Sequence, residues 1–206
     1  MRSLIATCAL LAATGCASVS DGAPAEVPAP GGWRAVATAA DRGRLRDWRQ
    51  AWVAGLRQAN ASDHRAAVAA EGVLLRPDTA LPGVALLPGE YRCRVIKLGS
   101  PGGGELPYVA YPTFRCRVDE RGVADDFIKL TGSQRPVGAL YSDSDTRMVF
   151  LGTLVLGDEA LPVRYGSDRE RDLIAVVERI GTARWRMVFP YPRFESLVDV
   201  IELTPA

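Results

Sequence analysis

The sequence has little histidine and cysteine, and its charges almost cancel. His64 is the only histidine, so a Ser-His-Asp triad has one possible base, and a zinc site lacks ligands of the usual number and spacing. The 25 lysine and arginine side chains face 24 acidic ones, a net charge of +1, which does not indicate a surface for nucleic acid. These scarcities argue against histidine-based catalysis, metal binding and nucleic-acid binding.

Long apolar runs are also scarce, and the one at the amino terminus is typical of an export signal. Residues 1–3 are Met-Arg-Ser, a short basic segment, and the apolar stretch 4–13 follows. That stretch is about half the length of a membrane-spanning helix, which needs about 20 residues. We therefore predict that residues 1–15 form a signal peptide.

The signal ends at Ala13-Thr14-Gly15-Cys16, which resembles the lipobox of bacterial lipoproteins, although Ala13 stands where leucine is usual. The resemblance implies that Cys16 is lipidated. Ala17 and Ser18 follow it, and the absence of an adjacent aspartate implies sorting to the outer membrane, facing the periplasm. The alternative is an ordinary secretory peptide cleaved after Ala25, which would give a soluble periplasmic protein.

Composition divides the rest of the chain. Residues 16–32 are rich in Ala, Pro, Gly and Ser and are predicted to be a flexible tether that begins with the lipidated cysteine. Residues 33–89 are predicted to be a helical region and linker, since Pro and Gly are frequent near its end. Residues 90–206 read as β structure. We expect the membrane, through the lipid, to be one partner of the protein.

The four cysteines are expected to serve three different roles. Cys8 lies in the discarded peptide and Cys16 takes the lipid, which leaves Cys93 and Cys116. Two cysteines in an exported protein most often form a disulfide, because the compartment is oxidising. Closing this loop is worth about 3 kcal/mol.

Each of these cysteines lies in one copy of a five-residue motif, an aromatic residue followed by Arg-Cys-Arg-Val. The two copies span residues 91–95 and 114–118. Alternation with period two predicts two half-buried strands. We expect an antiparallel pair with three facing couples: Cys93 with Cys116, Arg92 with Arg117, and Arg94 with Arg115. Four arginines on one face are a candidate site for phosphate, carboxylate or an envelope glycan. The alternative is a solvated face with local salt bridges.

Two helices are expected before the strands. Thr38 resembles an N-cap. The apolar residues Leu45, Trp48, Trp52 and Leu56 recur at spacings of three and four, which predicts a helix packed on the domain, or alternatively a partner-binding or membrane-surface helix. A second, short helix is expected from a cap at Ser62 through residue 70.

Eight short β segments follow, separated by turn residues. They are centred on residues 91–98, 113–118, 126–130, 137–141, 148–156, 173–180, 185–189 and 197–203. Residues 168–180 also fit a capped helix, but Ile174, Val176 and Val177 are β-branched and favour a strand. The predicted fold is mainly β: an eight-stranded antiparallel barrel of calycin or lipocalin type, with one or two N-terminal helices packed on it.

A second candidate binding stretch is 129–138, where small residues let a ligand approach the backbone. Ser133, Gln134 and Arg135 supply its polar groups, although a plain polar turn is the alternative. Carboxylate pairs at Asp143 with Asp145 and at Glu170 with Asp172 could serve a glycosidase-like site. Both pairs lie in turn-like sequence, where acidic residues are common.

Five stretches of the chain, 33–36, 91–99, 129–138, 148–152 and 194–203, together resemble a bacterial family of exported proteins known only as a domain of unknown function. The resemblance implies no activity and no catalytic residues. Lipid, tether and one-disulfide barrel also resemble, in architecture alone, the lipoprotein relatives of metalloprotease inhibitors.

We therefore expect a non-enzymatic envelope lipoprotein whose barrel binds an unknown small ligand or an envelope protein. The sequence predicts no cofactor, metal or nucleic acid for it. A protease inhibitor that uses the N-terminal region as an arm is the first alternative. An envelope hydrolase with carboxylate catalysis is the second.

Overall fold

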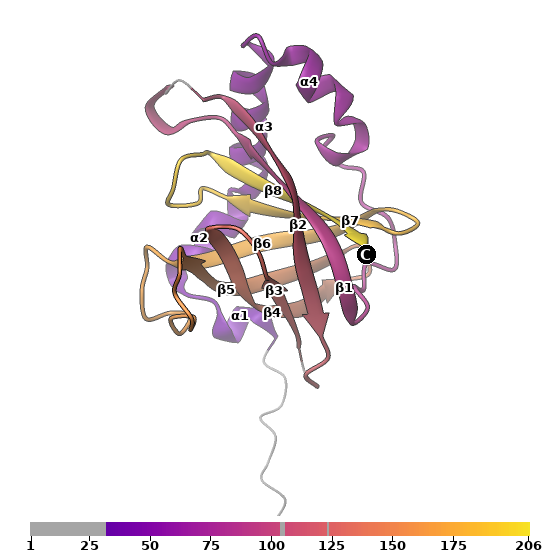
Figure 1. The fold of residues 1–206 in the computed structure, drawn as a ribbon, viewed down its shortest axis with the longest axis vertical. Coiled ribbons are helices and arrows are strands. Elements are labelled where there is room, and N and C mark those ends of the chain that lie inside the picture. Colours follow the sequence, from indigo (N-terminus) through magenta and orange to yellow (C-terminus); the bar gives the residue numbers. More distant parts are fainter. Residues whose placement is uncertain (1–31, 104–105, 123) are drawn as a thin grey trace, which may run out of the picture.

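The computed structural model describes residues 32–206 except 104–105 and 123. The predicted signal peptide, Cys16 and the tether lie outside the described residues. Eight antiparallel strands close into a barrel in sequence order, β1 beside β8 (Figure 1). The strands are β1 Gly89–Leu98, β2 Tyr108–Asp119, β3 Asp125–Lys129, β4 Gln134–Ser144, β5 Arg147–Leu156, β6 Asp172–Gly181, β7 Arg184–Pro190 and β8 Val198–Pro205. The predicted mainly-β barrel is confirmed, and the contested segment is strand β6.

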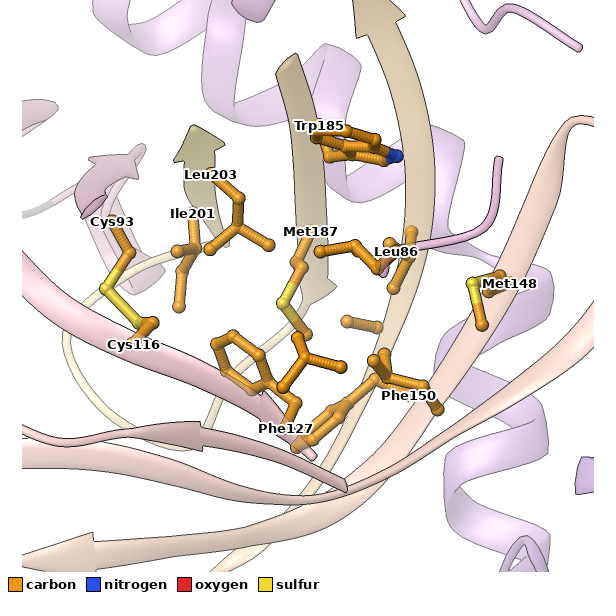
Figure 2. Packing of buried hydrophobic residues seen from close by; sticks show 14 of the residues in the cluster. Leu86, Cys93, Cys116, Phe127, Met148, Phe150, Trp185, Met187, Ile201 and Leu203 are labelled. Carbon is orange, nitrogen blue, oxygen red and sulfur yellow. A yellow bond between two sulfur atoms is a disulfide. The ribbon is translucent and has the colours of Figure 1, made fainter. Parts of the chain in front are cut away.

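Inward-facing side chains of all strands form a core inside the barrel, as alternation along a strand requires. Figure 2 shows this core. The rings of Phe127 and Phe150 pack edge to face in it, with their centres 5.8 Å apart. Met187 and Leu203 are also fully buried there. A single interior cluster of this kind holds the strands together through burial of apolar surface.

The predicted disulfide between Cys93 and Cys116 is confirmed, with Cα atoms 5.9 Å apart (Figure 2). The predicted register is wrong. Cys93 lies opposite Phe114, Tyr91 opposite Cys116, and Arg92 opposite Arg115. The cysteines are diagonal neighbours on the inner face, and their separation lies within the roughly 4.4–6.8 Å that a disulfide spans.

A β-bulge accompanies this register. Arg94 pairs with Thr113 and Ile96 with Ala110, so one residue of β1, Val95, faces two of β2. An extra residue on one strand shifts every pair beyond it and strengthens the local twist.

Among the described residues, four short helices and a 3-10 turn precede the barrel, more than the one or two helices that we expected. They are α1 Trp33–Val36, α2 Ala39–Arg46, α3 Trp48–Asn60, α4 Arg65–Ala70 and the turn Gly72–Leu74. Thr38 caps α2 as predicted, accepting a hydrogen bond from the Asp41 amide. Ser62 is not the N-cap of α4. That position is His64, whose amide donates to the Ser62 hydroxyl.

Helix α3 lies on the outside of the barrel, over β1, β7 and β8 (Figure 1). Trp52 is fully buried there, in one cluster with Ile96 and Leu98. Trp48, Trp52 and Leu56 of the predicted stripe pack in this cluster, as expected. Leu45 does not, because it lies in the separate helix α2 and packs with Val149 and Leu151. A Cβ on Gly55 would lie 2.9 Å from the Leu98 carbonyl oxygen, so a small residue is needed for this close contact. Among the described residues, no helix is long and apolar enough to cross a membrane.

The two ends of the barrel differ. One end is closed by the linker before β1, whose Val84 and Leu86 belong to the interior cluster. The Trp185 indole donates to the Val84 carbonyl at 2.9 Å, and the Val84 amide donates to the carbonyl of Asp145 in the β4–β5 turn. The opposite end, formed by the β3–β4, β5–β6 and β7–β8 connections, contains a cavity.

Candidate functional site: a cavity at the open end of the barrel

The cavity has a volume of about 340 Å³ and enters the barrel between the β3–β4 turn and the β7–β8 loop. This volume lies at the lower end of the range for small-ligand sites, roughly 300–1,000 Å³. Much of its wall is apolar. Val95, Leu154, Leu173, Phe189 and Ile201 line it from five different strands. Two lysines supply positive charge within this apolar wall.

Lys97, on the inner face of β1, is 5% exposed and is fully partnered. Its ammonium donates to Gln134 Oε1 at 3.1 Å and lies 3.2 Å from carboxylate oxygens of both Asp199 and Glu195. Burial alone would lower the pKa of Lys97, but the two carboxylates outweigh it and raise the pKa above its usual value. Lys97 is therefore held as a cation.

Lys129, at the end of β3, is 3% exposed and has neutral partners. Its ammonium donates to the backbone carbonyls of Thr131 at 2.8 Å and Gln134 at 2.9 Å, and lies 3.7 Å from the centre of the Phe114 ring. Burial, with the nearby charges of Arg135 and Lys97, lowers the pKa of Lys129 to about 8. The two lysines thus share a wall but differ in their partners.

The β7–β8 loop forms the opposite, acidic side of the mouth. Glu195 and Tyr191 have positive φ angles of 72° and 46°, a conformation that costs non-glycine residues energy and often occurs at functional sites. The loop places Phe194 against the interior cluster and Arg193 3.8 Å from Glu170 of the β5–β6 connection. Burial raises the pKa of Asp199, which lies just beyond the loop.

The predicted residues of the 129–138 stretch separate into two groups. Ser133 and Gln134 line the cavity. Arg135 does not; its guanidinium donates to the carbonyls of Gly132, Gly157 and Glu159 and ties the β3–β4 turn to the β5–β6 connection.

The four arginines of the repeated motif lie on the outer face of the barrel, away from this cavity. Arg94 pairs with Glu71 and Glu202, Arg115 with Glu90 at 3.3 Å, and Arg117 with Asp119 at 2.8 Å. Arg92 is exposed and faces Arg115 across the strand pair. Three of the four charges therefore have an acidic partner within the chain.

The predicted carboxylate pairs are not the acids that converge here. Asp143 accepts from the Trp33 indole at 2.7 Å, and Asp145 accepts from the Gly83 amide. Asp172 accepts from the Gly166 amide on the outer face, whereas Glu170 reaches the cavity rim. Within the described part of the chain, no group of three His, Cys, Asp or Glu residues could hold a metal ion.

Sequence reasoning missed Lys97 and both acids that contact it. A signal for the lysines was present, because Lys97 shares the phase of Cys93 on β1 and Lys129 shares the phase of Phe127 on β3. Period-two alternation therefore places both ammonium groups on the inner face. Glu195 had no comparable signal, since it belongs to a loop.

Comparison with known proteins gives a family and no function. The family model described as "Domain of unknown function (DUF4893)" matches residues 33–203. No curated protein and no solved structure matches the chain.

Proposed function

Because the chain belongs to the DUF4893 family, whose function is unknown, we propose its function from the site: a non-enzymatic binding protein of the cell envelope. The barrel holds a small, largely apolar ligand at its open end. Lipidated Cys16 attaches the protein to the outer membrane, with the barrel in the periplasm. The observation that carries the binding role is the cavity of about 340 Å³ with its apolar wall and convergent polar groups.

The contrast between the two barrel ends supports a binding role. Val84, Leu86 and Trp185 close one end with apolar side chains and a hydrogen bond. The other end keeps Leu154, Leu173 and other apolar side chains around an open volume. An unfilled apolar volume costs stability through lost contacts, so retaining one is most simply explained by a ligand that fills it.

An enzyme with carboxylate chemistry has one observation in its favour. Glu195 and Asp199 both contact the Lys97 ammonium at the cavity, and a glycosidase uses a pair of neighbouring carboxyl groups. Both carboxylates, however, are already paired with the ammonium of Lys97, which lies 3.2 Å from each, whereas a general acid and a general base must contact the substrate. Helices α1, α2 and α3 pack on strands of the barrel and α4 packs on α3, so the described helices are engaged within the domain and give an inhibitory arm no support.

The binding role is tested by NMR titration of the folded domain with 1-octanol. We expect saturable shifts confined to amides around the cavity. A Leu154→Trp variant fills the cavity and abolishes binding, while Leu161→Trp, at a side chain that is 80% exposed and does not line the cavity, binds like the wild type. A cooperative thermal unfolding transition is required of both variants, as a check that each one is folded. Unsaturable shifts, or equal binding by both variants, would contradict the proposal.

A further inference from the structure

The positive charge of Lys129 is not balanced within its surroundings. Among the described residues, no carboxylate lies within 4 Å of its ammonium, and its contacts are two carbonyl oxygens and the Phe114 ring. The charges that shift its pKa, those of Arg135 and Lys97, are also positive. A buried ammonium without an anion is costly unless a partner is supplied.

Lys97 is a control within the same cavity. Its ammonium has two carboxylate partners, so its charge is already compensated by the chain. The two lysines contact opposite ends of one residue, Gln134, through its side-chain oxygen and its carbonyl respectively. The β3–β4 wall is therefore the positive side of the cavity, and the uncompensated charge on it belongs to Lys129.

We propose that the ligand is a monoanionic amphiphile, a carboxylate on an apolar chain, with its carboxylate beside Lys129 and its chain against Leu154, Leu173 and Ile201. The inference rests on the proposed binding function and names the chemical class of its ligand. A carboxylate supplies the charge that the wall lacks, and a charge-assisted hydrogen bond to an ammonium is stronger than one between neutral groups.

The volume limits the length of the chain. At about 30 Å³ for each water-sized group, 340 Å³ holds roughly eleven non-hydrogen atoms. Octanoate has ten, which makes it a suitable probe. 1-Octanol and octylamine match its length and replace the negative charge by none and by a positive charge.

The pH dependence of binding follows from the same charge. The pKa of Lys129 is about 8 in the free protein, and octanoate stays ionised above pH 6. If only protonated Lys129 binds the carboxylate, affinity falls about tenfold between pH 7 and pH 9. The other titratable or charged groups that line the cavity are Lys97, Tyr111, Glu170, Arg193, Glu195 and Asp199. The Lys129→Met variant keeps all of these groups, so the pH dependence that it removes reports on Lys129.

The experiment measures the affinity of the wild-type domain for the three probes by calorimetry at pH 6.5, 7, 8 and 9. We expect octanoate to bind at least about tenfold more tightly than 1-octanol at pH 6.5, with the difference lost at pH 9. Lys129→Met removes the selectivity and keeps 1-octanol binding. Arg92→Met, which removes an exposed arginine of the outer face, leaves the selectivity unchanged.

The outcomes separate the two proposals. Equal affinity for octanoate and 1-octanol, or preference for octylamine, overturns the carboxylate inference and leaves the binding function standing. Failure of all three probes to bind overturns both. The wild-type comparison needs no variant, so the inference remains falsifiable if Lys129→Met does not fold.

Discussion

Replacing Arg186 by methionine tests how the helical region is joined to the barrel. Arg186 lies on the outer face of β7 and is fully buried, with its guanidinium 4.4 Å from the centre of the Trp52 ring of α3. Its guanidinium donates to Glu178 at 2.7 and 2.9 Å and to the carbonyls of Val73, Leu74 and Arg76 at 2.7–3.1 Å. One side chain thus connects two strands with the segment that follows α4.

The expected loss can be estimated from these contacts. Removing Arg186 leaves Glu178, which is 2% exposed, with Arg147 at 3.3 Å as its remaining cation. Breaking a buried pair in this way costs about 3–5 kcal/mol. Among the orphaned carbonyls, that of Leu74 is buried, and an unsatisfied buried acceptor costs about 1–3 kcal/mol. The two costs overlap, so we expect a loss of about 4 kcal/mol.

Urea unfolding followed by circular dichroism measures the loss. Glu178→Gln keeps an acceptor for the guanidinium and is expected to cost less than Arg186→Met. The control is Arg49→Met, whose partner Asp78 is also exposed, and which is expected to cost less than about 1 kcal/mol. If Arg186→Met and Arg49→Met destabilise the protein equally, the buried guanidinium does not join the helical region to the barrel.

Three further predictions concern the disulfide, a glycine contact and the lipid. Replacing Cys93 and Cys116 by alanine is expected to lower the free energy of unfolding by about 3 kcal/mol, and two free thiols in envelope-isolated protein would exclude the bridge. Gly138→Ala places a Cβ 2.2 Å from the Leu151 carbonyl oxygen and is expected to lower the free energy of unfolding by about 1–3 kcal/mol. Gly43→Ala in α2 is expected to raise the free energy of unfolding. A change of the same sign in both variants would contradict this account. Cys16→Ser is expected to remove the acyl mass and the membrane association, and an unchanged fractionation would refute lipidation.

Strand positions were predictable because alternation survives wherever one face of a strand meets solvent. Strand β6 was ambiguous for a physical reason. Its inner residues, such as Ala175 and Val177, face the barrel core, and its outer residue Ile174 packs beneath α1. A strand buried on both faces loses its alternation and can resemble a helix. The β-branched residues favoured the correct assignment.

Register was less predictable than strand position. The two similar motifs at 91–95 and 114–118 suggested that like residues face one another, but each predicted partner on β2 is displaced by two residues in the structure. The bulge at Val95 that belongs to this register has no clear sequence signal. The disulfide prediction succeeded despite the wrong register, because both registers place Cys93 and Cys116 on the inner face.

Only half of the site could be predicted, for a related reason. Ser133 and Gln134 follow from a turn-rich stretch, and the inward phase of Lys97 and Lys129 is contained in the alternation of their strands. The cavity itself depends on what leaves the open end unfilled. The cavity arises from the way several connections between strands pack together in space, and the sequence of one segment does not indicate this.

The position of Trp33, where the first helix begins, indicates from which side a ligand reaches the cavity. The Trp33 indole donates to Asp143 beside the β4–β5 turn, and the closing linker meets the same turn through Val84 and Asp145. The described chain therefore begins at the closed end, and the cavity opens at the other. If Cys16 holds the protein on the membrane, the mouth lies at the end of the barrel remote from the residue at which the predicted tether joins it. An anion of about ten non-hydrogen atoms, which is soluble in water, fits uptake from the aqueous side better than extraction from the bilayer.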